Sequence, residues 1–359
     1  MGNFRVFFDA SKTTNGHRFY SNLADRLRRY SSRKSDVMLF NVSANISDIL
    51  FSKLCGNKVV VRVASLYFDV YNSDAARSVS PWQRNLYQAL LYIGVSLEFV
   101  SDLYNFFNRN YGVFIRVILS DYLIHQSVFS KSVLDRYFPS KKGVIIPNGT
   151  KIMEQVTKNC SKEHFQLLTV YDSTRVSKRL YDLLEFVEYA NKNDFISSLT
   201  ILGFDHKFCD GYPPDFEKKL KSKYVNLVPK FNDITEDIAR YYQNSDTFIT
   251  FTYRDACPNI VVEAMAFGIP VIALNSGGLS DLIKPCDLLV PFSDTHLSFH
   301  VPHRYTHDFP IIDFDYVLGI LKKIKSNPQL YRSQIQKMFI NHLEIDVVSK
   351  RYQFFLESI

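Results

Sequence analysis

The chain has 359 residues, of which 46% are hydrophobic and 22% charged, a composition that excludes disordered and fibrous proteins. This length exceeds the roughly 250–300 residues at which a single core stops growing, so two domains are favoured. The net charge of +7 is uneven, because residues 1–150 hold 19 Lys and Arg against 10 Asp and Glu. A basic first half is typical of a protein with an anionic partner, such as nucleic acid, a phosphorylated acceptor or a membrane. Solvated surface charge without a partner is the alternative.

Cysteine usage and the lack of long apolar runs predict a cytoplasmic protein. The five cysteines are scattered without a C-x-x-C or Cys/His cluster, which argues against a disulfide framework and a structural zinc site. They are Cys55, Cys160, Cys209, Cys257 and Cys286. The amino-terminal stretch lacks the apolar core of a signal peptide, and no run of about 18 apolar residues predicts a membrane span.

Apolar runs alternate with amphipathic stretches in the first half, which indicates a parallel sheet covered by helices. A strand is predicted over residues 4–10, followed by a helix over residues 16–30 with Phe19, Leu23 and Leu27 on one face. Further strands are predicted over residues 36–42, 58–64, 122–127 and 143–149. The turn Pro147-Asn148-Gly149 ends the last of them.

The pattern restarts after a polar connector over residues 150–164. Strands are predicted over residues 165–172, 198–204, 246–253 and 269–275, and helices over residues 178–192, 235–245 and 259–267. We therefore expect an α/β fold of two doubly wound, Rossmann-like domains, residues 1–150 and 151–340. A last helix within residues 341–359 is expected to pack back on the first domain.

The stretch RDACPNIVVEAMAFGIPVIALNSGGLSDLI, residues 254–283, places polar groups beside two predicted strands. Asp255 follows one strand, Pro258 suits the first position of the next helix, and Gly268 ends that helix. The Gly277-Gly278 pair follows the next strand. Because ligands of open α/β sheets bind outside the carboxyl ends of the strands, these residues predict a binding site.

Each of these residues has a possible chemical role. Gly277 and Gly278 would let the backbone approach a ligand, and the helix start after them would offer N–H groups to a phosphate. Glu263 would accept two hydrogen bonds from a vicinal diol such as a ribose. A solvated carboxylate is the alternative for Glu263, although its apolar neighbours would leave only one face exposed.

Residues 254–283 resemble the signature of GT-B-fold glycosyltransferases of family 4, which is an acid, seven residues, a Glu, and then a Gly-Gly loop. Here it is Asp255, Glu263 and EAMAFGIPVIALNSGG, with Asp in place of the usual first Glu. Three further stretches are similar to other sequence segments of this family: VIIPNGTK, QSVFSKSVLDRYF and LLTVYDSTRVSKRLYDLLEF. Lys178 stands at the family's lysine position, whereas Ser173 stands at the arginine position, so Arg175 is expected to compensate.

The resemblance implies a retaining hexosyltransferase, with a donor cleft between the two domains. A nucleotide sugar would be held mainly by the second domain, and a glycan or lipid-linked acceptor mainly by the first. It implies catalysis by Asp255 and Lys178, with no metal and no cofactor. The donor-binding residues that it implies are Glu263, Arg175, Asn259, Ser276, Gly277, Gly278 and Gly16. Bacterial surface-polysaccharide synthesis, such as that of O-antigen, capsule or lipopolysaccharide, is the expected setting, with no nucleic acid as partner.

Several alternatives stay open. One set of apolar side chains would either form a face for peripheral contact with an anionic membrane or pack in a core: Trp82, Tyr87, Leu90 and Leu91. His17 and His125 are candidates for polar contacts near the transferred sugar, with structural hydrogen bonding as the alternative. A catalytically inactive nucleotide-sugar-binding scaffold and a nucleotide-sugar epimerase are the rival functions.

Overall fold

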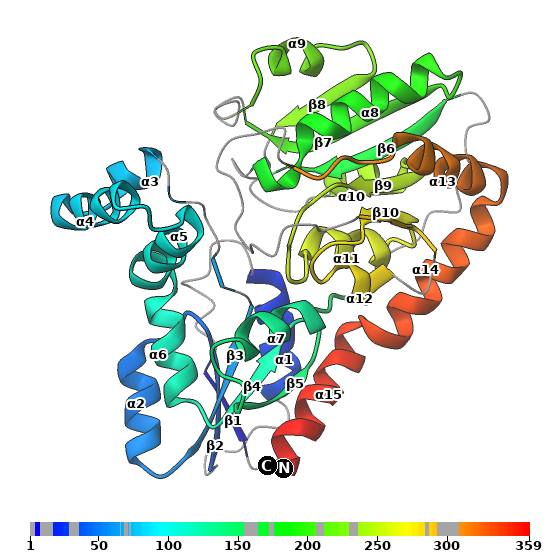
Figure 1. Ribbon diagram of the computed structural model, residues 1–359. Coiled ribbons are helices and arrows are strands. Elements are labelled where there is room, and N and C mark those ends of the chain that lie inside the picture. The colour runs from blue at the N-terminus through cyan, green and yellow to red at the C-terminus, as the bar shows by residue number, and fades with distance from the viewer. Residues whose placement is uncertain are drawn as a thin grey trace. The chain divides into compact units, whose positions relative to one another are not determined.

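The computed structural model describes residues 4–7, 17–28, 36–64, 66–67, 71, 73–153, 164–171, 176–205, 212–229, 236–283, 287–292 and 309–359. These residues form two compact units. The first contains the described residues up to Pro147 together with Ser349–Ile359, and the second those from Asn148 to Val348. Each unit holds a parallel sheet with interleaved helices, so the predicted α/β fold is confirmed (Figure 1).

The first unit contains a five-stranded sheet whose strands follow one another in chain order. All neighbouring pairs are parallel. The strands are β1 (Phe4–Phe7), β2 (Val37–Asn41), β3 (Lys58–Val63), β4 (Tyr122–His125) and β5 (Lys142–Ile145). Strands β2 and β3 are buried along almost their whole length, as expected for a parallel sheet covered by helices.

Helices connect these strands, and α2 and α6 lie side by side against β3 (Figure 1). The helices are α1 (His17–Arg28), α2 (Ile46–Leu54), α3 (Ser73–Ser78), α4 (Pro81–Tyr92), α5 (Leu97–Asn105), the π-helix η2 (Phe106–Asn110), α6 (Tyr111–Leu119) and α7 (Val128–Asp135). The sequence did not predict the four consecutive helical segments from α3 to η2. They carry a small core of their own around Tyr71, Tyr87 and Tyr104.

The membrane face expected on α4 is wrong for most of its residues. Tyr87 is only 1% exposed and stacks edge-on against Tyr71, with ring centroids 4.9 Å apart. Leu90 and Leu91 pack against the same cluster. Trp82 is 65% exposed and is not part of that cluster. The alternative of core packing therefore holds for Tyr87, Leu90 and Leu91.

The last helix, α15 (Ile345–Ser358), contributes its final residues to the first unit. The Nε atom of Arg62 on β3 donates to the Tyr352 hydroxyl at 2.7 Å. The Lys58 ammonium donates to the carbonyl of Ile359 at 3.0 Å, and the ring of Phe355 meets that of Tyr122. These contacts attach the chain end to β3 and β4.

The second unit contains a six-stranded parallel sheet in the order β11-β10-β9-β6-β7-β8. The strands are β6 (Phe165–Val170), β7 (Ser197–Phe204), β8 (Val225–Pro229), β9 (Thr247–Thr250), β10 (Val271–Leu274) and β11 (Leu289–Val290). Strands β9 and β10 are buried at every residue. The chain moves outward from β6 in one direction and from β9 in the other, so the order reverses between these two strands.

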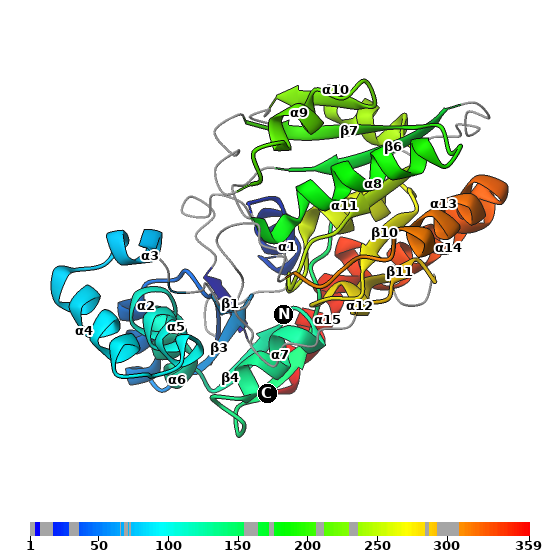
Figure 2. The same ribbon diagram turned by 45° about the horizontal axis from the view of Figure 1, so that its top comes forward.

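Helices cover this second sheet, with α8 along β7 and α11 along β10 (Figure 2). They are the 3-10 turn η3 (Val176–Lys178) and the helices α8 (Leu180–Lys192), α9 (Phe216–Leu220), α10 (Glu236–Gln243), α11 (Asn259–Ala266), α12 (Leu279–Ile283), α13 (Phe314–Ser326) and α14 (Pro328–His342). No helix within the described ranges is long and apolar enough to cross a membrane.

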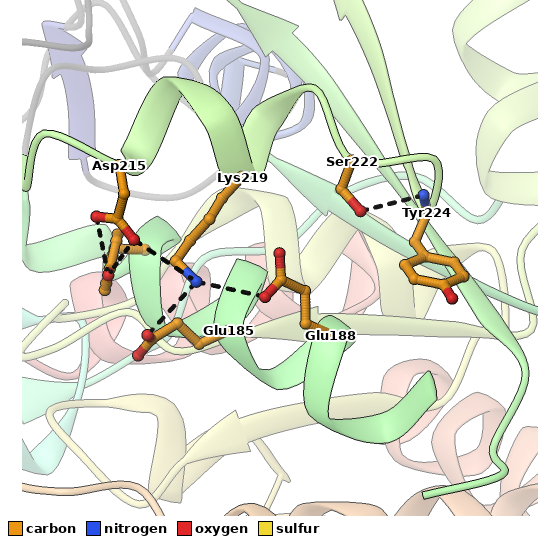
Figure 3. A network of polar contacts seen from close by, with 7 residues as sticks. Glu185, Glu188, Asp215, Lys219, Ser222 and Tyr224 are labelled. Atoms are coloured by element: carbon orange, nitrogen blue, oxygen red, sulfur yellow. Dashed lines mark hydrogen bonds and ion pairs between the residues drawn. The ribbon is translucent and has the colours of Figure 1, made fainter. Parts of the chain in front are cut away.

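A polar network fastens α9 to α8 (Figure 3). The Lys219 ammonium of α9 lies 3.4 Å from Glu188 and 3.6 Å from Glu185, both on α8. It also lies 3.8 Å from Asp215, which accepts hydrogen bonds from the Tyr181 hydroxyl. Because a lysine lies among the three carboxylates, their charge is partly neutralised within the protein.

His125 ends β4 and is fully buried in the first unit, and neither ring nitrogen has a hydrogen-bond partner among the described residues. The expectation of a structural hydrogen-bonding role is therefore wrong for His125. Burial lowers its pKa to about 4; the Asp135 charge opposes this shift and the Lys131 charge adds to it, each by less than burial. The ring is neutral at pH 7, as its apolar surroundings require.

We predict that this histidine makes the protein acid-labile. The unfolded chain takes up a proton near pH 6.5, whereas the folded ring resists it down to about pH 4. The stability due to the neutral ring is full above pH 6.5 and is lost as the pH falls towards 4, by about 3 kcal/mol in all. Urea unfolding at about pH 5 and pH 7.5 should show about 2 kcal/mol of this loss in the wild type and a flatter profile in His125→Leu. The exposed His342, replaced in the same way, is the control, and an identical acid loss in His125→Leu would contradict the assignment.

Candidate functional site

The candidate site lies at the carboxyl edge of the second sheet, where the strand order reverses between β6 and β9. Strand β9 pairs with β6 on one side and β10 on the other, all in parallel. The segments that follow these three strands therefore emerge at the same edge. Outside such a reversal two neighbouring loops diverge and leave a crevice, which is where open α/β sheets bind ligands.

Lys178 and Asp255 meet at this edge from different loops. Lys178 ends η3 after β6, and Asp255 lies in the loop after β9. The Lys178 Nζ atom lies 3.5 Å from Asp255 Oδ2, with the two side chains 16% and 29% exposed. The structure thus brings together the two residues expected to be catalytic, with both still partly accessible to solvent.

The backbone and the second oxygen of Asp255 hold the loops in place. Its Oδ1 accepts from the Cys257 N–H at 3.1 Å, and its carbonyl accepts from the Gly278 N–H at 2.7 Å. The amide of Gly278, which sequence reasoning offered to a phosphate, is therefore engaged within the protein. Helix α12, which follows, has only five residues.

Gly277 has a structural reason to be glycine. Its φ is +63°, and a Cβ atom there would lie 2.4 Å from the carbonyl oxygen of Asp255. Ser276 beside it accepts from the Arg254 N–H at 3.1 Å. The Gly-Gly loop was expected to allow a ligand to approach, but here Gly277 and Ser276 serve the contact between the loops after β9 and β10.

Two arginines at this edge share the left-handed backbone of Gly277. Arg179 has a φ of +53° and Arg254 a φ of +56°, a conformation that costs a non-glycine residue about 1–3 kcal/mol. The Tyr253 N–H donates to the carbonyl of Ser177 at 2.7 Å, and this hydrogen bond joins the loop after β6, which precedes Arg179, to the loop after β9, which contains Arg254. Strained backbone of this kind clusters at functional sites, so its presence supports the location.

Sequence reasoning missed Arg179, the residue after Lys178. Its side chain is 1% exposed and binds Asp182 through two hydrogen bonds of 2.8 and 3.0 Å. Its guanidinium also lies over the rings of Phe309 and Phe292. An arginine three residues before an aspartate at a helix start was the available signal. This ion pair fixes the backbone that carries Lys178.

Glu263 and Asn259 lie on α11, beyond Pro258. Glu263 is half-buried, and its neighbours on the helix, Val262 and Ala264, are buried. The Oδ1 atom of Asn259 accepts from the side chain of Asn148 at 2.6 Å, and Asn148 also donates to the carbonyl of Cys257 at 3.1 Å. Asn259, expected to bind the donor, is thus held by the Pro147-Asn148-Gly149 turn.

Other predicted residues lie outside the described ranges. These are Gly16, Ser173 and Arg175, together with Cys160, Cys209 and Cys286, and the side chain of His17 is likewise not described. The described part of the site therefore contains one of the two expected phosphate-binding cations, Lys178. Arg254, on the adjoining loop, is a cation that the sequence argument did not use.

Within the described ranges no set of three or more His, Cys, Asp or Glu side chains is arranged to hold a metal ion. The sequence does contain one Asp-x-Asp tripeptide, at Asp313 and Asp315. Asp313 caps α13 by accepting from the Tyr316 N–H at 2.9 Å, and Asp315 accepts from the Tyr189 hydroxyl at 2.5 Å. Both carboxylates thus have structural partners.

Comparison with known proteins agrees with this geometry. Residues 168–299 match the sequence model of the family described as "Glycosyl transferases group 1". A Haemophilus influenzae protein described as an uncharacterized glycosyltransferase is 36% identical over 61 residues. That alignment covers 17% of this chain and 16% of the relative, so it spans far less than two thirds of that protein.

Solved structures resemble the chain over nearly its whole length. Anabaena HepE, in complex with UDP and glucose, has a TM-score of 0.57 at 14% identity and covers 100% of both chains. Sucrose-phosphate synthase from Thermosynechococcus elongatus has a TM-score of 0.57 at 14% identity, covering 98% of this chain and 82% of its own. An E. coli structure described as trehalose-6-phosphate, bound with UDP-2-fluoro glucose, has a TM-score of 0.57 at 11% identity, covering 96% and 78%. The fold is that of the GT-B glycosyltransferases.

We predict that Gly277→Ala will disrupt the site and the fold around it. The left-handed backbone costs an alanine roughly 1–2 kcal/mol, and the clash with the Asp255 carbonyl adds to it. Urea unfolding should therefore show a loss of at least about 2 kcal/mol.

Gly319→Ala is the matched control, because a Cβ atom there meets nothing within 4 Å inside α13. That change should stabilise the protein by roughly 0.5–1 kcal/mol through helix propensity. Equal effects of the two substitutions would refute the loop contact.

Proposed function

We propose that this chain is a retaining glycosyltransferase that moves a hexosyl group from a nucleotide sugar to a glycan or lipid-linked glycan. The observation that carries the proposal is the Lys178–Asp255 pair at the reversal between β6 and β9. Glu263 follows on the adjoining helix, and the family match covers this region. The Anabaena structure with UDP and glucose supports a nucleotide-sugar donor.

In this proposal Lys178 stabilises the diphosphate leaving group. Negative charge grows on the diphosphate as the bond to the sugar breaks, and a fixed cation in a poorly hydrated site counters it without reorganisation. Asp255 holds the ammonium in place when no donor is bound. When the diphosphate takes over that ammonium, the Asp255 carboxylate is released to contact the sugar, whose anomeric carbon gains positive charge. No metal is required for these steps.

Glu263 is assigned to the ribose of the donor. Its half-buried carboxylate suits a vicinal diol, whose two hydroxyls would donate to the two carboxylate oxygens. The buried residues on either side of it restrict the side chain, so the carboxylate is positioned before the ligand arrives. Asn259 and the backbone around Gly277 and Ser276 then act by holding the loops that surround this position.

For the acceptor we propose a saccharide of bacterial surface-polysaccharide synthesis, reached from the cytoplasmic side of an anionic membrane. The surplus of Lys and Arg in residues 1–150 supports attraction to anionic lipid. On α4 the membrane contact is assigned to large exposed side chains at the two ends of the helix, which are Trp82, Tyr92 and Ile93.

Nucleotide-sugar binding is the first test of this function. Calorimetry with UDP-, GDP-, ADP- and CDP-sugars should detect one preferred nucleotide. Glu263→Gln should weaken it roughly 10- to 100-fold, because two hydrogen bonds to a charged group become weaker or are lost. Glu217→Gln, an exposed residue of α9, is the control. Unchanged affinity in Glu263→Gln would remove the ribose assignment.

Transfer chemistry is the second test. Asp255→Asn keeps an oxygen for the Cys257 N–H but loses the charge, so the loop should persist while kcat falls by roughly 100-fold or more. Nucleotide affinity, measured on the same samples, should change little by comparison. Turnover at the wild-type rate would refute the catalytic assignment.

The rival functions give different results in these assays. Epimerisation of a nucleotide sugar in the absence of acceptor would indicate that the protein is an epimerase and not a glycosyltransferase. An inactive scaffold would bind a nucleotide tightly but would neither transfer the sugar of any donor nor hydrolyse any donor, even slowly.

A further inference from the structure

Two neighbouring helices of the first unit, α2 and α6, carry apolar residues on more than the side that faces the sheet. They lie side by side against β3 (Figure 1). Towards the sheet, Ile49 of α2 and Val113 and Val117 of α6 are buried in the core. Away from the sheet both helices expose large apolar residues, where an ordinary surface helix has charged ones. They are Leu50, Phe51 and Leu54 of α2 and Tyr111 and Ile118 of α6, which are 43–77% exposed.

The spacing of these five residues makes them one surface, which we call the α2–α6 face. Leu50 and Leu54 are four residues apart, so they lie on the same side of α2. Tyr111 and Ile118 are two turns apart on α6, and the half-buried Ile115 lies between them. Because the helices are neighbours, the two apolar stripes adjoin. A helix that is apolar all round is normally covered, so we expect another surface to pack on this face.

The size of the α2–α6 face suits a protein–protein contact. An interface of standard size removes about 800 Å² from each partner. An aromatic side chain contributes roughly 150–250 Å² when it is fully buried. Phe51 is 69% exposed and Tyr111 53%, and the three aliphatic residues add to them. Together these side chains supply most of the area that a stable contact requires.

The charged residues of the two helices are few and balanced in sign. Lys53, in the last turn of α2, forms an ion pair with Asp121, which follows α6. Asp48, in the first turn of α2, is exposed and accepts a hydrogen bond from the Asn45 side chain at 3.2 Å. The face therefore lacks the surplus of one sign that would make two copies of it repel each other.

Two further cations beside the face donate to backbone carbonyls. Arg116 of α6 donates to Ala44 at 2.8 Å and to Gly112 at 2.6 Å. Lys141 donates to the carbonyl of Ile118 at 3.1 Å, at the end of α6. An anionic membrane attracts cations that are available to its headgroups, whereas these are engaged within the protein and Asp48 is exposed. The charges thus favour a protein surface over lipid as the partner of this face.

We propose that the α2–α6 face is the interface of a dimer formed by two copies of this chain. A two-fold contact packs one patch against an identical patch, which suits a face that is apolar and balanced in charge. Both helices lead into strands of one parallel sheet, so they run in the same direction. A two-fold axis across them sets the same pair of the other copy antiparallel, with Asp48 of one α2 level with Lys53 of the other. Four helices then enclose one apolar layer.

Sedimentation velocity of the full chain over a concentration series, without nucleotide or sugar, tests the proposal. The wild type should form a reversible dimer. Phe51→Asp on α2 and Ile118→Asp on α6 should each raise the Kd of the dimer at least about 100-fold, because the symmetry places two carboxylates in a dehydrated contact. Both side chains are exposed in the single chain, so the far-UV circular dichroism of the variants should equal that of the wild type.

Phe354→Asp is the matched control. Phe354 lies on α15, is 78% exposed and does not belong to the α2–α6 face, so the dimer should keep its Kd. Equal weakening in this variant would show that any added carboxylate disrupts association, and it would overturn the assignment of the face.

Two further outcomes would also overturn the proposal. One is a wild type that stays monomeric throughout the series, and the other is a dimer that persists in both Phe51→Asp and Ile118→Asp. Flotation with phosphatidylglycerol vesicles distinguishes lipid as the partner. Vesicle binding by a monomeric wild type that is lost in Phe51→Asp would assign the face to a membrane. Because these measurements need no donor, their outcome is independent of the proposed glycosyltransferase function.

Discussion

Asp255 is the residue on which the candidate site depends, because it joins three loops at once. One carboxylate oxygen meets Lys178 after β6, the other accepts from Cys257 within its own loop, and its carbonyl accepts from Gly278 after β10. The net energy of a partly exposed ion pair is small, since desolvation offsets most of the attraction. The contribution of Asp255 is therefore geometric: it fixes where the lysine charge lies relative to the edge of the sheet.

Strain in the backbone accompanies this geometry and has to be compensated nearby. Arg179 adopts a left-handed conformation that a glycine would adopt more easily, so a side-chain interaction must hold it there. The two hydrogen bonds to Asp182 and the rings of Phe292 and Phe309 provide that interaction. The same ion pair anchors the first turn of α8. Rigidity next to Lys178 thus comes from a buried charge pair and not from hydrophobic packing alone.

Hydrophobic periodicity and strand ends predicted the α/β class and a binding site at the edge of the second sheet, whereas Lys178 was assigned to that site by the resemblance to the glycosyltransferase signature. The sequence did not predict what satisfies each polar group. The Gly278 amide, the Asn259 side chain and the Asp313 carboxylate all find partners within the protein, which only three-dimensional proximity reveals. The helices from α3 to η2 were missed because apolar residues such as Tyr87 face a small local core, and periodicity does not say which surface covers them.

Two buried polar residues of the first unit show how charge decides what a polar group requires. His125 can lose its proton, so it tolerates an apolar environment as a neutral ring. Arg62 cannot, and it is surrounded by hydroxyls and an amide instead. Tyr20 and Tyr352 accept at 2.6 and 2.7 Å, and Gln126 accepts at 2.9 and 3.0 Å once its side-chain amide is turned so that the oxygen faces the guanidinium. These partners come from α1, α15 and the end of β4. A single guanidinium therefore gathers distant segments around β3, and it keeps the last helix on the first sheet because its charge has to be solvated by the protein.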